Sequence, residues 1–178
     1  MTNPSRLTLL AVLLTLPSLG NAQANPNVLS LPLGASVEMA LISPLALSAE
    51  TSHASNIIMH PVNQGIGSHN LPNYCVLTGD AQRDDDRVII TAKQMTCIEA
   101  TGADSAIFSG KLSAAAYDAD NTFGLPVCQD SGCTLTPTDS FILTFNDAIS
   151  IEQQRNPSAE INAMRRQHGK QAESSESQ

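Results

Sequence analysis

The chain has 178 residues and a formal net charge of −8 at pH 7, with 17 acidic side chains against 9 lysines and arginines. This acidic balance disfavours nucleic acid and anionic lipid as main partners, because both bind clustered basic residues. Aromatic residues make up only 3% of the chain and Trp is absent, so a core must be built from Ile, Val, Leu, Ala and Met.

The first 24 residues have the pattern of a cleavable export signal. Arg6 precedes the apolar run Leu7 to Leu16, and the segment ends in the small-x-small site Ala22-Gln23-Ala24. The run is shorter than the roughly 20 apolar residues that span a bilayer. We therefore expect an exported, periplasmic protein whose mature chain begins near Asn25 and has no membrane span.

Beyond the signal, the sequence predicts three parts. Residues 25–32 are polar and contain proline, which indicates an extended, loosely held segment. Residues 33–151 alternate short apolar runs with turn residues, and this spacing predicts a small all-β barrel or sandwich. In residues 152–178 we expect a short helix from Ser158 to His168, stopped by Gly169, followed by a disordered polar end.

The expected strands follow one another at short intervals. They are Val37 to Ile42, Asn56 to Val62, Tyr74 to Thr78, Arg87 to Ala92, Lys93 to Glu99, Ala106 to Ala114, Phe141 to Phe145 and Ala148 to Ile151. The β-branched run Val88-Ile89-Ile90 suits a strand that is buried on both faces. Residues 48–56, 63–70, 79–86 and 102–104 are expected to be loops or turns.

Four cysteines in an exported chain favour disulfide bonds. Three pairings are compatible with the sequence. Cys128 and Cys133 enclose a turn-forming segment, which favours a local bridge and would leave Cys75 with Cys97. The pairing stays open at this point. A redox or metal site is the rival interpretation, but there is no C-x-x-C and no pair of histidines at ligand spacing.

The acidic loop between Cys75 and Cys97 is a candidate interaction loop. Its charged residues are Asp80, Asp84, Asp85, Asp86 and Arg87. The loop lacks the alternating spacing of a calcium loop, so we interpret it as a charged hairpin tip. The segment Asp118-x-Asp120-Asn121 is closer to that spacing, but Phe123 stands where a calcium loop needs glycine, and a solvent-exposed turn is favoured.

The residues indicate no catalytic constellation. The histidines, His53, His60, His69 and His168, are scattered along the chain. A G-x-S-x-G nucleophile motif and a phosphate-binding glycine loop are both absent from the sequence. We therefore predict a protein that is not an enzyme and holds neither a metal nor a cofactor.

Residues 33–151 resemble the C-terminal β-barrel domain of the TrbI/TraB family. The first matching features are Gly34-Ala35-Ser36-Val37 and an apolar strand from Asn56 to Pro61. The segment LPNYCVLTGDAQRDDDRVIITAKQMTC then carries an acidic loop between two cysteines. Gly110, the turn at Asp120, Gly124-Leu125 and the run from Phe141 to Ile151 fit the family's later segments.

Members of this family are scaffold subunits of the conjugative type IV secretion channel. They usually have a cytoplasmic tail, an inner-membrane helix and a proline-rich arm, whereas this chain has a cleavable signal. The family's outer-membrane helical hairpin is replaced here by the short Cys128–Cys133 loop. The resemblance therefore implies a periplasmic structural or accessory component, and association with the outer membrane would come only through its partners.

The partners that the resemblance implies are secretion-channel subunits, including a lipoprotein, or further copies of the chain itself. The alternative is a free-standing exported binding domain without catalytic activity. Such a domain would take a cation or another ligand at Asp80 to Asp86 or at Asp118 to Asn121.

Overall fold

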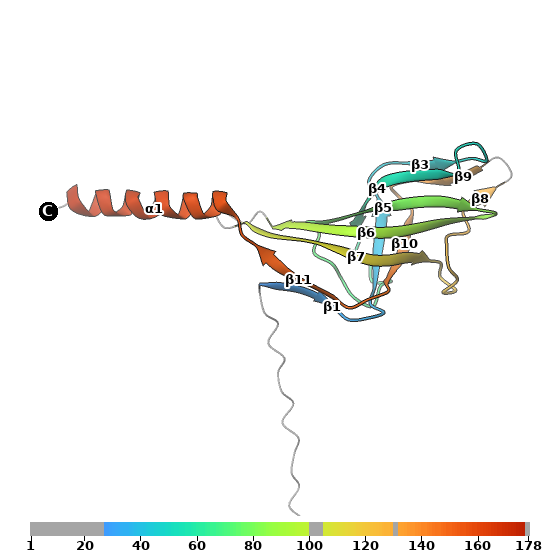
Figure 1. The fold of residues 1–178 in the computed structure, drawn as a ribbon, viewed down its shortest axis with the longest axis horizontal. Helices are drawn as coiled ribbons and strands as arrows, with labels where there is room; N and C mark the ends of the chain where they lie inside the picture. Colours follow the sequence, from blue (N-terminus) through green and yellow to red (C-terminus); the bar gives the residue numbers. More distant parts are fainter. Residues whose placement is uncertain (1–26, 100–104, 130–131, 177–178) are drawn as a thin grey trace, which may run out of the picture.

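A closed antiparallel sheet forms the centre of the protein (Figure 1). The computed structural model describes residues 27–99, 105–129 and 132–176, with side chains as far as His168. The predicted export signal and the predicted turn at 102–104 therefore lie outside the described residues. The ring contains β2 (Ser36–Leu41), β4 (His53–Pro61), β5 (Cys75–Asp84), β6 (Arg87–Glu99), β7 (Ala106–Tyr117) and β10 (Ser140–Phe145).

Strand β7 closes the ring because it pairs on both edges. The sheet order runs β7-β10-β2-β4-β5-β6, and β6 pairs with β7 again. Closure pairs each of these strands with a neighbour on both sides over at least part of its length, which limits the exposed strand edge that could pair with another chain. The predicted small all-β fold with disulfide bonds is confirmed.

Two further strands extend the barrel as a ribbon. β1 (Val28–Leu31) pairs with β11 (Ile149–Gln154), and β11 joins β7 through Gln153 and Gln154. The expectation that residues 25–32 are loosely held is therefore wrong for Val28–Leu31. Proline and polar neighbours suggested a loose segment, but Leu31 is buried and its strand has a partner far away in the sequence.

The segment from Arg87 to Glu99 is one strand rather than the two that we predicted. Thr78 pairs with Gln94 and Gly79 with Ala92, so Lys93 is bulged out between them. A bulge interrupts the alternation of side chains without ending the strand, which is why the sequence looked like two strands. A Cβ on Gly79 would lie 2.0 Å from the Thr91 carbonyl oxygen, so glycine is required opposite this bulge.

A second, smaller sheet packs beside the barrel and was missed by the sequence analysis. It joins β3 (Leu45–Leu47), β9 (Gly132–Leu135) and β8 (Cys128–Gln129). These strands are too short to show a clear alternating pattern. Leu45, Leu47 and Leu135 are nevertheless buried. The start of β4 was missed as well, since residues 53–56 were expected to be loop.

Side chains that point into the ring form one apolar core. In β6, Val88 and Ile90 are at most 1% exposed, whereas Ile89 is half-buried. The run is therefore buried on one face and not on both, as expected for a strand of a barrel with a solvated outer surface. The largest apolar side chains of the core belong to Met39, Leu41, Met59, Leu71, Leu77, Ile90, Met95, Leu143 and Phe145. The core is therefore built mainly from Ile, Val, Leu, Ala and Met, as the sequence predicted.

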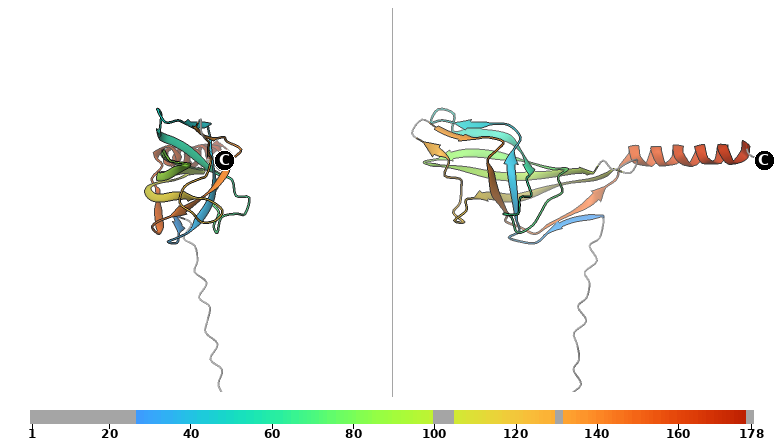
Figure 2. Two further views of the ribbon diagram at one scale, coloured as in Figure 1. Left: turned by 90° about the vertical axis from the view of Figure 1, so that its right-hand side faces the viewer. Right: turned by 180° about the vertical axis from the view of Figure 1, so that it is seen from behind.

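The C-terminal segment forms one helix that leaves the barrel. α1 (Pro157–Glu176) begins at the far end of the β1–β11 ribbon and extends away from the sheet (Figures 1 and 2). Asn156 caps it, because its Oδ1 accepts a hydrogen bond from the Ala159 amide at 3.3 Å, and Pro157 occupies the first helical position. The predictions of a Ser158 cap and of a stop at Gly169 are wrong, since Asn156 caps the helix and the helical backbone continues to Glu176. Residues 177–178 of the expected disordered end lie outside the described residues.

Candidate interaction surface

Asp80 does not belong to the acidic hairpin tip with which we grouped it. It lies within β5, where its carboxylate pairs with Lys93 and accepts a hydrogen bond from the Asn56 amide. The hydrogen bond from Lys93 and that from Asn56 lower the pKa of Asp80. Asp80 thus stabilises the bulges of β4 and β6, and it is not part of a loop that could close on a ligand.

The hairpin tip itself is shorter than predicted. β5 ends at Asp84 and β6 begins at Arg87, so Asp85 and Asp86 form a two-residue turn, with Asp85 at a φ of 49°. Aspartate tolerates this left-handed conformation better than most residues. The backbone oxygen of Asp86 accepts a hydrogen bond from the Cys128 amide at 3.3 Å. The tip is thereby tied to the small sheet.

Arg87 turns away from this tip and holds the loop that follows β7. Its guanidinium donates to Asp118 Oδ2 at 2.5 Å, to the Phe123 carbonyl at 3.0 Å and to the Gly124 carbonyl at 2.6 Å. The two charged side chains are only 22% and 15% exposed. Arg87 therefore positions this loop rather than presenting its charge to a partner.

The Asp118 to Asn121 segment is a turn that its own hydrogen bonds hold in place. Asp118 Oδ1 accepts hydrogen bonds from the Thr122 amide at 2.8 Å and from the Asp120 amide at 3.0 Å. The bond from Arg87, followed by those from Thr122 and Asp120, lowers the pKa of Asp118. A cation would have to displace Arg87 from this carboxylate.

The described residues contain no group of three or more His, Cys, Asp or Glu side chains that could hold a metal ion. His53 and His60 both lie on β4, and each bonds a neighbour in the chain. His69 bonds Ser68, and His168 lies on α1. His53 lies close enough to Asp80 to help lower the pKa of that carboxyl, but no histidine of the described residues belongs to a group of three or more potential metal ligands.

The loop held by Arg87 forms one wall of an apolar groove. The groove has a volume of about 480 Å³ and lies where this loop meets the start of β10. Its walls include Ile66, Tyr117, Leu125, Leu135, Phe141 and Ile142. Clefts of about 300–1,000 Å³ with mostly apolar walls are typical binding sites.

Two carboxylates and an exposed aromatic ring complete this surface. Asp118 and Asp139 line the groove beside the apolar side chains. Hydrogen bonds from the Thr136 amide and hydroxyl lower the pKa of Asp139. Phe123 is 46% exposed and packs edge-on against Tyr117, with the ring centroids 5.7 Å apart. The surface can take apolar side chains that carry a positive charge at their edge.

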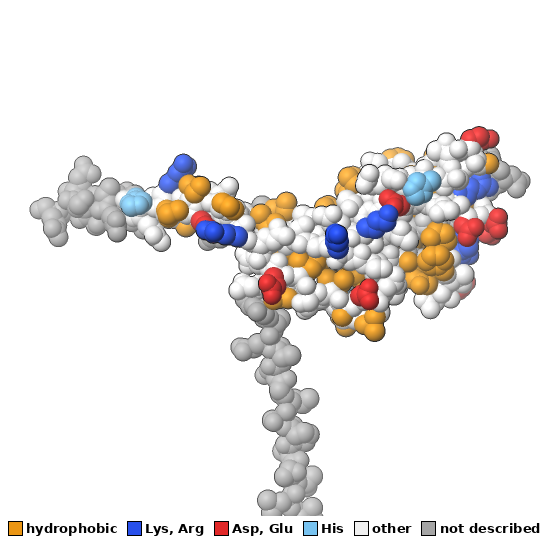
Figure 3. Space-filling model, viewed as in Figure 1, with side chains coloured by type: hydrophobic (Ala, Val, Ile, Leu, Met, Phe, Trp, Pro, Cys, Tyr) orange, Lys and Arg blue, Asp and Glu red, His pale blue; other side chains and the backbone are white. Residues whose placement is uncertain are grey.

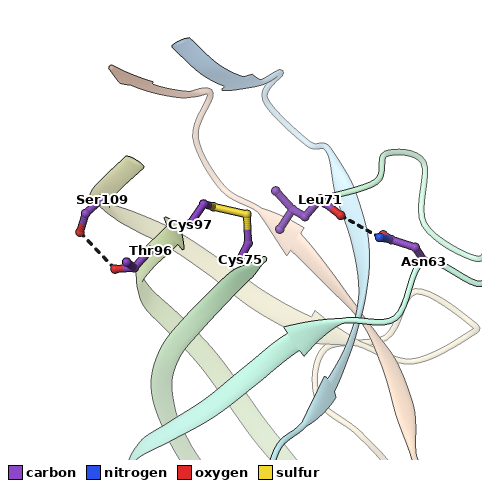
Figure 4. The surroundings of a disulfide bond; sticks show 6 residues. All are labelled: Asn63, Leu71, Cys75, Thr96, Cys97 and Ser109. Carbon is purple, nitrogen blue, oxygen red and sulfur yellow. Dashed lines mark hydrogen bonds between the residues drawn. A yellow bond between two sulfur atoms is a disulfide. The ribbon is translucent and has the colours of Figure 1, made fainter. Parts of the chain in front are cut away.

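The four cysteines form the two disulfides that the sequence favoured but left open. Cys75 bridges to Cys97 and Cys128 bridges to Cys133. The first lies within the barrel wall, where Cys75 opens β5 and Cys97 lies near the end of β6 (Figure 4). Beside it, the hydroxyls of Thr96 and Ser109 bond across β6 and β7 at 3.1 Å. The barrel bridge is shielded from solvent, because Cys75 and Cys97 are fully buried, whereas Cys128 of the hairpin bridge is half-buried.

The sequence analysis missed a buried acid in β2. Glu38 is 1% exposed, and its Oε2 accepts a hydrogen bond from the Gln64 amide at 2.8 Å. Its Oε1 has no hydrogen-bond partner within the described part of the chain. The segment after β4 covers it, with Asn63 donating to the Leu71 carbonyl at 2.7 Å (Figure 4). The signal was present in the sequence as one acid inside the apolar run of residues 37–41.

Within the described residues, no helix has the length and hydrophobicity needed to cross a membrane. Comparison with known proteins adds no relative. No protein-family model matches the chain, and no curated protein matches it. The TrbI/TraB resemblance of residues 33–151 therefore stays a prediction, and what the protein does must be argued from its own surface.

Proposed function

We propose that this protein is an exported structural or accessory component of a conjugative type IV secretion apparatus, acting through protein–protein contacts. The export pattern in residues 1–24 and the TrbI/TraB resemblance motivate the proposal. The two disulfides are consistent with an oxidising compartment such as the periplasm.

The observation that carries the proposal is α1. This helix has 20 residues and makes no extensive contact with any described strand. An isolated helix of this length is only marginally stable in water. A helix that leaves a disulfide-stabilised barrel is therefore best explained as a contact element for another protein chain.

The proposal is tested by affinity capture from membranes of the native host. The full chain, tagged after Gln178, is cross-linked in cells and recovered after detergent extraction, and co-purifying proteins are quantified by mass spectrometry. We expect secretion-channel subunits to be enriched over an untagged strain. The variant Ile161→Glu with Met164→Glu should lose this enrichment, whereas Leu33→Glu, which alters a more exposed apolar side chain on the barrel, should keep it.

Recovery of the wild-type protein alone and soluble would overturn the secretion role. The apolar groove beside β10 then favours the second candidate function, a free-standing exported domain that binds an apolar ligand. The two functions predict that different variants lose binding. A ligand-binding domain would depend on Tyr117 and Phe141 and would tolerate the loss of α1.

A further inference from the structure

One face of α1 is apolar with a positive charge at its edge. Ile161 and Met164 are 46% and 53% exposed. They are three residues apart, and Arg165 follows Ile161 by four, so the three side chains share one helical face. Nothing in the described barrel covers this face (Figures 1 and 2).

The groove beside β10 is complementary to this face of α1 in hydrophobicity and charge. Its walls are apolar, and Asp139, whose carboxylate the Thr136 amide and hydroxyl help to keep ionised, lies among them. Figure 3 shows that hydrophobic side chains gather over the end of β7, on a part of the barrel remote from α1. An apolar helical face with an adjacent arginine matches such a groove in both hydrophobicity and charge.

The helix cannot reach the groove of its own chain. The base of α1 is held beside the start of β7, because Asn156 donates to the Ser105 carbonyl at 3.1 Å and Gln154 pairs with Ile107. The groove lies at the other end of β7, at Tyr117, about 35 Å away for a strand that rises roughly 3.3 Å per residue. Ile161 and Met164 lie only about 6 and 10 Å along the helix from Pro157.

We propose that α1 of one copy docks its Ile161–Met164 face into the groove of a second copy, with Arg165 beside Asp139. The inference rests on the proposed function, in that it names the partner for one of its protein–protein contacts. The helix and the groove are different surfaces, so the contact is head-to-tail. Repetition of such a contact produces a closed ring or an open filament.

The first measurement is sedimentation velocity of the purified exported chain over a range of concentrations. We expect species larger than monomer to form as concentration rises. In the helix variant, Ile161→Glu with Met164→Glu, the Kd of association should weaken by at least about 30-fold, the effect of losing a central interface anchor. Glutamate keeps helix propensity high and also places a negative charge near Asp139.

The groove variant combines Ile66→Gln with Pro126→Gln. Both residues line the groove and are exposed, so the barrel should fold, as circular dichroism can check. The new amide side chains remove apolar surface that Ile161 and Met164 would contact, and association should weaken to a similar extent. The matched control is Leu33→Glu. Leu33 is 69% exposed and lies next to Gly34, which bonds Phe145 at the opposite end of β10 from the groove.

Mixing the two variants gives the decisive result. The helix variant keeps an intact groove and the groove variant keeps an intact helix, so together they can form one contact and no more. We expect each variant alone to be monomeric and the equimolar mixture to form a 1:1 dimer that grows no further. A mixture that stays monomeric, or single variants that associate like the wild type, would overturn the proposal.

This outcome is independent of the secretion role. A purified wild-type chain that remains monomeric, while capture from membranes still recovers channel subunits through α1, would reject the second copy as occupant and leave the proposed function standing. Self-association without recovery of channel subunits would support docking to a second copy and reject the secretion role.

Discussion

At the scale of single residues, Arg87 shows how a charged side chain can be misread. It ends an acidic run and was grouped with a candidate interaction loop. Its guanidinium instead bonds Asp118 and two carbonyls of the loop after β7. The partners lie 31 to 37 residues away, so no local pattern could reveal them.

The Arg87–Asp118 pair predicts a stability that depends on pH. Because the folded protein lowers the pKa of Asp118, this carboxylate stabilises the fold above its unfolded pKa of about 3.9 and stops doing so as pH falls through the folded value. Asp118→Asn should lower the Tm at pH 7 by a few degrees, and the difference from wild type should shrink as pH falls below the unfolded pKa of about 3.9.

Thermal unfolding followed by circular dichroism at pH 7, 5, 3 and 2 checks this expectation. Asp84→Asn is the matched control, because Asp84 is exposed and forms no ion pair with any described residue. A difference between Asp118→Asn and wild type that is constant across this range would show that the ion pair is not its cause.

At the scale of elements, the two disulfides stabilise different parts of the fold. Cys75 and Cys97 close a loop of 22 residues in the barrel wall, whereas Cys128 and Cys133 are separated by 5 and close the small β8–β9 hairpin. In the chain-entropy model a bridge stabilises more when its loop is longer. Both sulfurs of the barrel bridge are also buried in the core.

Removing the barrel bridge should therefore cost more than removing the hairpin bridge. Cys75→Ala with Cys97→Ala is expected to lower the free energy of unfolding by about 3–4 kcal/mol, and Cys128→Ala with Cys133→Ala by about 2 kcal/mol. Urea unfolding at pH 7 measures both. Equal losses, or the reverse order, would contradict the assignment of the barrel bridge as the main covalent support of the fold.

At the scale of the whole molecule, α1 is expected to contribute little to the free energy of unfolding of the barrel. The helix is tied to the sheet near its base, by the Asn156–Ser105 hydrogen bond, and makes no extensive contact beyond it. A chain that ends at Asn156 should therefore keep the Tm of the full protein within about 2 °C when both are measured at low micromolar concentration.

Scanning calorimetry of the two chains provides this measurement. A loss of many degrees on truncation would mean that α1 packs on the barrel in solution, which would also remove the basis for docking to a second copy. At higher concentration the full chain alone should gain stability, because association favours the folded state by mass action.

The sequence by itself determined the all-β class and most of the strands, and it favoured a local bridge between Cys128 and Cys133 without fixing the pairing of the four cysteines. Alternating side chains, turn residues and a short Cys–Cys spacing are local properties of the sequence, so they can be recognised without knowing the tertiary contacts. The same logic failed at Lys93, where a bulge imitates a strand end, and at Gly169, through which the helix continues.

Only the tertiary structure decided the candidate site. The groove requires Ile66, Tyr117, Leu125 and Phe141 to come together from four separate segments, and the burial of Glu38 depends on the segment that covers β2. Such features arise because ring closure brings together strands that are far apart in the sequence. One sequence does not show which distant residues will be in contact. The docking face of α1 was visible as Ile161 and Met164, but its meaning depends on the barrel leaving it uncovered.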